Sequence, residues 1–179
     1  MNLLDSVLTA NGGKGVTQLA NQFGLSEAQT TSAIQNLLPG IAAGMQHNLG
    51  QDGLPGLLRA LQEGHHEKYI DDPSTLSSGT AEQDGNGILG HVLGSKEVSR
   101  QVAARAASST GIGQDILKRM LPMIAAMAMG ALSKRTDRGG TTGQGSGAGM
   151  DITSMLGPLL DRNRDGSVVD DLLGSLFKK

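Results

Sequence analysis

The stretch MLPMIAAMAMGAL, from Met120 to Leu132, is the longest apolar run in the chain and decides the fold. A membrane-spanning helix needs roughly 18 or more apolar residues, whereas a run of about 10–14 is typical of a buried core helix. Basic pairs flank the run, Lys118 and Arg119 before it and Lys134 and Arg135 after it. We therefore predict that this stretch forms a core helix rather than a membrane span.

The composition of the rest of the chain also favours helices. Hydrophobic residues make up 37% of the 179 residues, yet there is no Trp, one Tyr and two Phe. Strands draw on aromatic and β-branched residues, so a core of Leu, Ile, Val, Met and Ala suits helices better. We predict an all-α, multi-helical fold.

Charge and cysteine content narrow the classes of function. The formal net charge of −2 gives no electrostatic reason to expect binding to nucleic acid or to an anionic membrane. The absence of cysteine excludes disulfides, thiolate zinc sites and a cysteine nucleophile. The N-terminal stretch MNLLDSVLTA has no basic region and carries Asp5, unlike a signal peptide. These features favour a cytoplasmic protein without a membrane or nucleic-acid partner.

Capping residues and apolar periodicity predict a series of short helices. Asn2 can cap a first helix over residues 3–10, Ser26 with Gln29 forms a capping box, and Ser95 can cap a later helix. Two sets of apolar residues recur at helical spacing: Val16, Leu19, Ala20, Phe23 and Ile34, Leu37, Leu38, Ile41. Pro39 should kink or restart its helix. We also predict helices over residues 54–62 and 116–132, with a polar stretch up to Asp84.

The chain divides by composition into three parts. A helical domain covers residues 1–134, a Gly/Ser/Thr linker covers 135–149, and a C-terminal helix–loop–helix covers 150–179. Within the domain, QLA at 18–20 matches QVA at 101–103, and NLLPGIAA at 36–43 matches RMLPMIAA at 119–126, at one spacing. We predict two related units, about 14–47 and 96–132, with Pro39 and Pro122 in equivalent places. Chance similarity between Ala- and Leu-rich segments is the alternative.

Three blocks of sequence carry a resemblance to a known family. They are DGNGILGHVLGSKEVSRQVA at 84–103, TGIGQDILKRMLPMIAAMAMGAL at 110–132 and LLDRNRDGSVVDDLLG at 159–174. In the ILGHVLGS block, the TGI step and the MLP bend, the chain resembles the bacterial domain-of-unknown-function family 937, which is grouped with the YidB-like proteins. The resemblance implies an all-helical fold over most of the chain and implies no chemistry.

The four histidines give little support to an enzyme. His65 and His66 are adjacent in GHHEKY and lack the i, i+4 spacing of a helical zinc pair, so we expect a solvated polar loop. His91 lies in an apolar segment, where we expect it to be half-buried as a packing or capping residue; His47 is the fourth. No serine lies in a nucleophile-elbow pattern. We expect no enzyme activity, no catalytic residues and no organic cofactor.

The segment from Val16 to Asn36 is similar to a helix-turn-helix, with Ala20 and Gly24 where the tight turn needs small residues. Its second helix, from Ser26, contains no Lys or Arg, and Glu27 lies where a phosphate would approach. Lys and Arg supply most of the non-specific affinity for DNA. The pattern therefore favours helix–helix packing over DNA binding.

Small residues four positions apart, Ala126 and Gly130, permit another helix to approach closely. Met123, Met127 and Met129 are adaptable side chains that can fill the space around them. We favour packing inside the core, with a self-association surface as the alternative.

The stretch LLDRNRDGSVVDDLL, residues 159–173, contains the sharpest chemical pattern. Asp161, Asn163, Asp165 and Gly166 match the first half of an EF-hand calcium loop, and the carbonyl of Ser167 can serve as the next ligand. The carboxylate that closes such a loop is missing. The candidate ligands are Asp161, Asn163, Asp165, Ser167, Asp170 and Asp171.

The alternative is a helix cap. Ser167 can cap the final helix with Asp170 three residues on, and acidic residues in a first helical turn are stabilising. Arg162 and Arg164 then neutralise Asp161 and Asp165 in place of a metal. Both interpretations fit the residues.

These observations favour a cytoplasmic, non-enzymatic helical protein that binds a protein partner or a second copy of itself. The alternatives are a weak calcium-binding protein and, with less support, a DNA-associated protein that uses segment 16–36.

Calcium binding can be tested by calorimetric titration of the wild type and of an Asp161→Ala, Asp165→Ala double variant. Because the closing carboxylate is missing, we expect weak binding, with Kd on the order of 10⁻⁴–10⁻³ M, that the double variant loses. No heat and no rise in thermal stability at millimolar calcium would leave only the helix cap.

Overall fold

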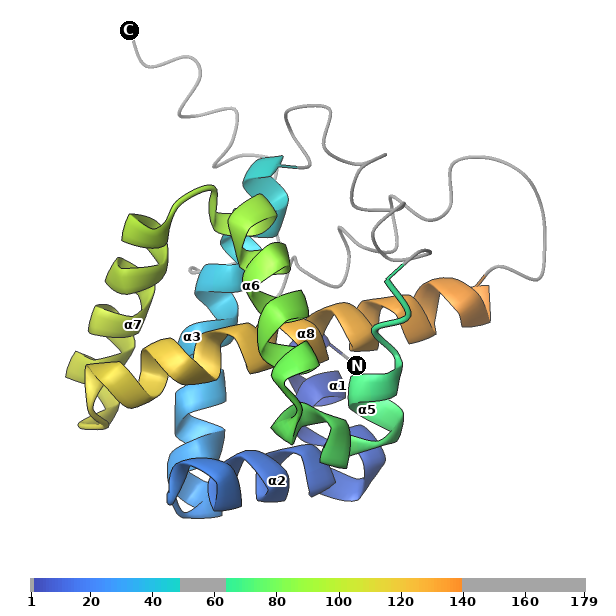
Figure 1. Cartoon of the computed structure of the whole chain (residues 1–179), viewed down its shortest axis with the longest axis horizontal. Helices are drawn as coiled ribbons and strands as arrows, with labels where there is room; N and C mark the ends of the chain where they lie inside the picture. The colour runs from blue at the N-terminus through green and yellow to red at the C-terminus, as the bar shows by residue number, and fades with distance from the viewer. Residues whose placement is uncertain (1, 49–63, 140–179) are drawn as a thin grey trace, which may run out of the picture.

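The computed structural model describes residues 2–48 and 64–139, which form seven α-helices and two short 3-10 helices (Figure 1). The α-helices are α1 (Leu3–Leu8), α2 (Lys14–Phe23), α3 (Glu27–Asn48), α5 (Lys68–Asp71), α6 (Gly79–Leu93), α7 (Lys96–Thr110) and α8 (Gln114–Gly139). The 3-10 helices are η1 (Ala10–Gly13) and η3 (Pro73–Ser77). These residues contain no strand, and the predicted all-α, multi-helical fold is confirmed.

Helix α8 runs across the middle of the molecule and contacts α1, α3, α5, α6 and α7 (Figure 1). Every residue from Met120 to Ser133 is buried. By length and composition the stretch Gln114–Lys134 is apolar enough to cross a membrane, but 83% of its apolar window is buried inside the protein. The core helix predicted from the apolar run is therefore present.

The predicted helix caps form as expected. The Asn2 side chain accepts from the Asp5 N–H at 2.8 Å, the Ser26 hydroxyl accepts from the Gln29 N–H at 3.1 Å, and Ser95 caps α7. Gly24 ends α2 in the left-handed conformation with φ 65°, which glycine adopts without a steric penalty. These local contacts set where α1, α3 and α7 begin and where α2 ends.

Helix α3 continues through Pro39, so the helix does not restart there. Proline removes one backbone hydrogen bond and presses against the preceding turn. Buried side chains on both sides of Pro39, Leu37 and Leu38 before it and Ile41 after it, hold both halves of the helix on the same core. Tertiary packing outweighs the local preference.

The prediction of a polar stretch up to Asp84 is wrong, because this part of the chain forms helices. Helices α5 and η3 form there, and α6 begins at Gly79. Five scattered apolar residues of this stretch are buried: Tyr69, Ile70, Pro73, Leu76 and Ala81. Polar neighbours hide their helical spacing in the sequence, and each finds a place in the core because other helices surround it.

The boundaries of the last described helix also differ from those expected. Helix α8 begins at Gln114 rather than Ile116 and continues to Gly139, into the predicted linker of residues 135–149. The helix predicted over residues 54–62 and the segment 150–179 lie outside the described residues.

Both proposed repeat units consist of a helix, a glycine turn and a long helix with an internal proline. The turn glycine lies 15 residues before Pro39 in the first unit, as Gly24, and 11 residues before Pro122 in the second, as Gly111. The difference is close to one helical turn, about 3.6 residues. The relation between the units stays a prediction.

Glycines bring two other segments against the backbone of α8. A Cβ at Gly85 in α6 would overlap the backbone of Pro122, and a Cβ at Gly130 in α8 would overlap the carbonyl of His66. Ala126 and Gly130 therefore lie inside the core, and the alternative of a self-association surface at these residues is wrong.

The contact between α6 and α8 can be tested with two alanine substitutions in the same helix. Gly85→Ala should lower the free energy of unfolding by about 3 kcal/mol, because the new methyl group forces two backbones apart. Gly87→Ala should raise it by about 0.5–1 kcal/mol, because no atom lies within 4 Å of that position and alanine favours the helix. Urea denaturation measures both, and equal effects would contradict the assigned contact.

Candidate functional site

The six candidate metal ligands of the C-terminal loop, Asp161 to Asp171, lie outside the described residues. Among residues 2–48 and 64–139, no group of three or more His, Asp or Glu side chains is placed to hold a metal ion. The calcium site therefore stays a prediction from sequence.

The histidines lie in different surroundings. His47, His65 and His91 are exposed, whereas His66 keeps only 7% of its surface accessible. The solvated loop expected for GHHEKY is therefore wrong for His66, and the half-buried environment expected for His91 is also wrong. His66 is buried because its carbonyl lies against Gly130 of α8, which brings the whole residue into the core.

A cluster of polar side chains connects α5 to α6 around the one tyrosine of the chain. The Tyr69 hydroxyl donates a hydrogen bond of 2.5 Å to Oδ2 of Asp84. Lys68 Nζ lies 3.4 Å from the same oxygen and 4.8 Å from the centre of the Tyr69 ring. The His66 ring stacks on Tyr69 with the ring centres 6.2 Å apart. We name these four residues the Tyr69 cluster.

Burial and hydrogen bonding shift the pKa values of Asp84 and Tyr69 in opposite directions. Burial raises the pKa of Asp84, but the hydrogen bonds from Tyr69 and Lys68 and the charge of Lys68 outweigh it, so the pKa is lowered. Burial, followed by the bond to Asp84, raises the pKa of Tyr69. Asp84 thus stays ionised and Tyr69 stays protonated near neutral pH. Their hydrogen bond fastens α5 to α6 and does not transfer a proton.

The sequence contained a signal for this cluster that our reading missed. His66, Tyr69, Ile70 and Pro73 fall at i, i+3, i+4 and i+7, and all four are buried. The helical spacing is hidden among polar neighbours, and the polar sequence GHHEKY favoured a solvated loop rather than a packed face.

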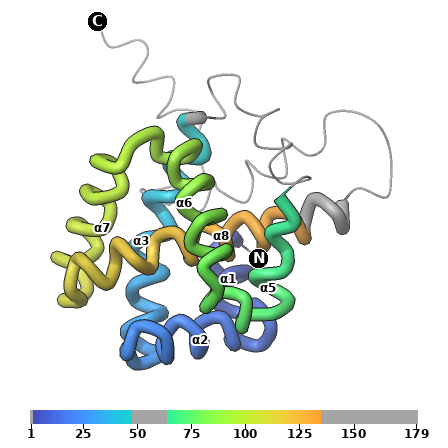
Figure 2. Tube along the Cα trace, in the orientation of Figure 1, coloured from blue at the N-terminus to red at the C-terminus, as the bar shows by residue number. Residues whose placement is uncertain are grey.

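The surface formed by α2, the turn after it and the first half of α3 is the second candidate site, and we name it the α2–α3 corner. Figure 2 shows α2 lying along the bottom of the view and α3 rising from the turn at its end. Its exposed residues are Lys14, Thr17, Asn21, Gln22, Gly24, Ser26, Glu27, Ala28, Gln29, Gln35 and Asn36. Lys14 and Glu27 are the charged residues among them, and the Glu27 carboxylate accepts a 2.6 Å hydrogen bond from Thr17.

Two half-buried apolar side chains, Phe23 and Leu25, lie at the turn of the α2–α3 corner and pack against the core. The guanidinium of Arg119, from α8, lies 5.6 Å from the centre of the Phe23 ring. This contact was not expected, because Arg119 is distant in sequence and reaches the corner only through the fold. It places a positive charge beside a segment that has none of its own after Lys14.

Comparison with known proteins gives one match. Residues 5–135 match the model of a family described as a bacterial protein of unknown function (DUF937). No curated protein matches the chain, and no solved structure matches it.

The role of the Tyr69 cluster can be tested with Tyr69→Phe, which removes the hydrogen bond to Asp84. We expect the free energy of unfolding at pH 7 to fall by about 1–2 kcal/mol, in the lower part of the range for bonds to charged groups, because Asp84 keeps Lys68 as a partner. Lys68→Gln should lower it by less than about 1 kcal/mol, because Lys68 is exposed and Asp84 is only half-buried, so water screens the ion pair.

The stability difference between the wild type and Tyr69→Phe should change with pH in a defined direction. A carboxyl group whose pKa is lowered by folding contributes stability above its ordinary pKa, and the contribution is lost as the pH falls through the lowered value. The difference between wild type and Tyr69→Phe should therefore narrow below about pH 4. Denaturation curves at pH 7 and pH 3.5 measure it, and an unchanged difference would contradict the assigned bond.

Proposed function

The chain belongs to the bacterial family of unknown function DUF937, and we propose that it is a non-enzymatic module that binds a protein partner through the α2–α3 corner. The observation that carries the proposal is the near absence of charge on this exposed surface, around the half-buried Phe23 and Leu25. We propose that the protein acts in the cytoplasm and binds neither a membrane nor a nucleic acid.

Protein-binding surfaces are depleted of Lys, Glu and Asp and enriched in aromatic residues and Arg. The α2–α3 corner has both properties, with Lys14 and Glu27 as the exposed charges of its two helices and with Phe23 beside Arg119 of α8. Aromatic and arginine side chains are the residues that most often dominate the binding free energy. Phe23 and Arg119 are therefore the proposed centre of the interface, and the Gln, Asn and Ser side chains form its rim.

The exposed face of α7 offers the contrast. Val98 is its large exposed hydrophobic residue, with 39% of its surface accessible, but Lys96, Glu97 and Arg100 surround it in sequence and are exposed as well. A charged surface of this kind is less easily desolvated by a partner. We therefore favour the α2–α3 corner and use α7 as the control surface.

The proposal that the protein is not an enzyme rests on the protonation states of its partly buried ionisable groups. The groups gathered in the Tyr69 cluster hold protonation states suited to a fixed hydrogen bond, and the core around them is packed with apolar side chains. The proposal that it has no membrane partner rests on α8, whose apolar residues are covered by other helices.

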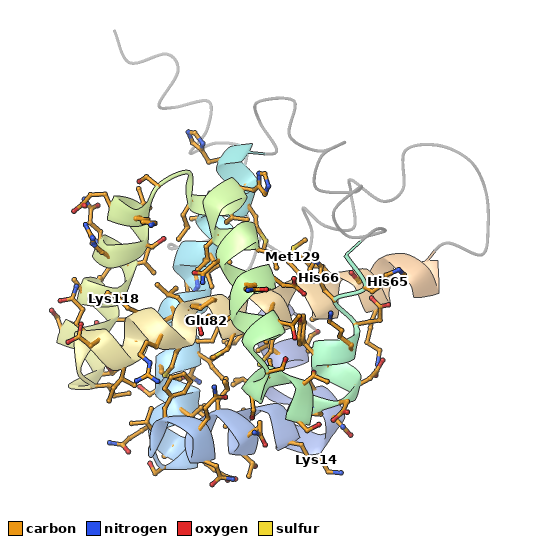
Figure 3. All side chains as sticks on the ribbon, in the orientation of Figure 1. Lys14, His65, His66, Glu82, Lys118 and Met129 are labelled. Atoms are coloured by element: carbon orange, nitrogen blue, oxygen red, sulfur yellow. The ribbon has the colours of Figure 1, made fainter. Side chains whose placement is uncertain are left out.

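DNA association through the same corner is the competing proposal. Arg119 and the exposed Lys14 of α2 supply some positive charge near α2 and α3. Lys118 of α8 pairs with Asp115 and lies at the left of the view in Figure 3, whereas Lys14 lies at the lower right. The exposed face of α3 contributes no positive charge, and Glu27 would repel phosphate. The charge is too sparse to favour a duplex over a protein.

Weak calcium binding by the C-terminal segment is a separate proposal. It is supported by the spacing of Asp161, Asn163 and Asp165 before Gly166 and is independent of the α2–α3 corner.

Matched double variants test the proposed interface. Ala28→Glu with Gln35→Glu adds two negative charges to one face of α3, and Ala104→Glu with Gln101→Glu adds the same charges to α7; all four residues are exposed. Affinity capture from a bacterial lysate should identify a partner that wild type and the α7 variant retain and the corner variant loses. In a titration with the purified partner, the corner variant should raise Kd at least about tenfold, or 1.4 kcal/mol.

Two other results would overturn the proposal. Equal loss of binding in both double variants would show that added negative charge weakens binding on either surface and that the α2–α3 corner is not the interface. Tight, salt-sensitive binding of the wild type to a labelled DNA duplex in a fluorescence anisotropy titration at physiological salt would replace the protein partner with nucleic acid.

A further inference from the structure

The Nδ1 atom of His66 is a buried side-chain atom that has no hydrogen-bond partner among the described residues. Buried polar atoms in folded proteins are nearly always paired, and an unpaired one needs a physical explanation. Because a neutral imidazole can leave Nδ1 without a proton but an imidazolium cannot, the site accepts the neutral ring and disfavours the charged one.

The position of His66 makes its charge state matter for the fold. Its carbonyl lies against Gly130 of α8, and its ring stacks on Tyr69. Figure 3 shows His65 and His66 where the chain approaches α8 beside Met129. The preceding residue, His65, has φ 44°, a left-handed conformation that is uncommon for residues other than glycine. The chain therefore enters this contact in a conformation that other contacts must maintain.

We propose that protonation of His66 detaches the segment of residues 64–78, which contains α5 and η3, from α8, so that the protein responds to mild acidification by local opening. This device goes beyond partner binding and does not depend on the α2–α3 corner.

The charged and titratable groups around His66 act in both directions. Burial lowers its pKa most strongly; Asp84 on α6 and Glu67 raise it, while Lys68 and His65 lower it. On α8, Lys134 lies one turn from Gly130 and pairs with Asp71. The result is a pKa below the ordinary 6.5, so the imidazole is neutral in the folded segment.

The sign of the effect follows from this direction. An opened segment exposes His66, whose pKa returns to about 6.5 and which binds a proton more readily than in the closed state. The stability of the closed segment is therefore full above about pH 6.5 and falls as the pH decreases toward the lowered value. Asp84 acts in a separate window, below about pH 4, so mild acid acts through the histidine.

Other contacts of the segment do not depend on this proton. Asn11 donates a 2.9 Å hydrogen bond to the carbonyl of Asp71, Lys134 pairs with the Asp71 carboxylate, and Gln18 bonds to Ser77. These contacts tie the later part of the segment to η1, α8 and α2. Opening should therefore begin at His66 and Tyr69 and then break these later contacts, while the helices outside residues 64–78 stay folded.

Tyr69 provides a reporter at the site. The chain has one Tyr and no Trp, so its intrinsic emission comes from this residue. A phenol bonded to a carboxylate emits weakly, and emission rises when the bond to Asp84 breaks. In the wild type, emission should rise at least twofold between pH 7.5 and pH 5.5, with a midpoint below 6.5.

The full-length protein is compared as wild type, His66→Asn and His65→Asn. The exposed His65 is the matched control, because asparagine tolerates its left-handed backbone. His65→Asn should respond to acid as the wild type does, and His66→Asn should show no rise in emission over this range. Hydrogen exchange of the wild type, corrected for intrinsic rates, should accelerate at least tenfold in residues 64–78 and remain unchanged in α3 and α7.

An acid response that persists in His66→Asn would overturn the inference, as would acceleration spread evenly over all helices. If His66→Asn does not fold, the measurements on the wild type are enough to test the inference. An NMR titration that gives His66 a pKa at or above 6.5, or an exchange rate in residues 64–78 that does not change with pH, would also overturn it.

Discussion

The close approach of two backbone segments to α8 is the constraint on which the rest of the structure depends. Helix α6 meets α8 at Gly85 and Pro122, and the chain before α5 meets it at Gly130 and His66. Because five other α-helices contact α8, its side chains must be apolar and mostly small, with methionines filling the remaining space. A chain with so few aromatic residues reaches a packed core by bringing backbones together rather than by filling the interior with large rings.

The same constraint determines where the chemistry of the protein lies. The contact at Gly130 draws His66 inward, and Tyr69 and Asp84 then bond within the interface between α5 and α6. The ionisable groups that the fold gathers are thus committed to holding a segment in place. The α2–α3 corner, by contrast, makes its contacts through Phe23 and Leu25 and leaves an almost uncharged polar surface exposed. The proposed acid response and the proposed partner surface thus lie in two separate parts of the molecule.

The two candidate sites differ in how far the sequence predicts them. The turn of the α2–α3 corner could be predicted from the sequence, because Gly24, Ser26 and Gln29 fix it by local hydrogen bonds. Most exposed positions of the corner are polar without being charged. The contact of Arg119 with Phe23 could not be predicted, since Arg119 reaches Phe23 only after α8 packs beside α2 and α3. The Tyr69 cluster was misjudged entirely, although Tyr69 and Ile70 have helical spacing from His66.

Local interactions explain what the sequence by itself determined: helix starts at Asn2, Ser26 and Ser95, the buried face of α3, and α8 as a core helix. Each depends on residues within about two turns of one another, so its pattern is visible in a short window. Only the tertiary structure decided that helices α5 and η3 and the start of α6 form before Asp84 and that His66 is buried. Those outcomes depend on a glycine far along the chain, whose missing side chain lets a backbone carbonyl approach α8.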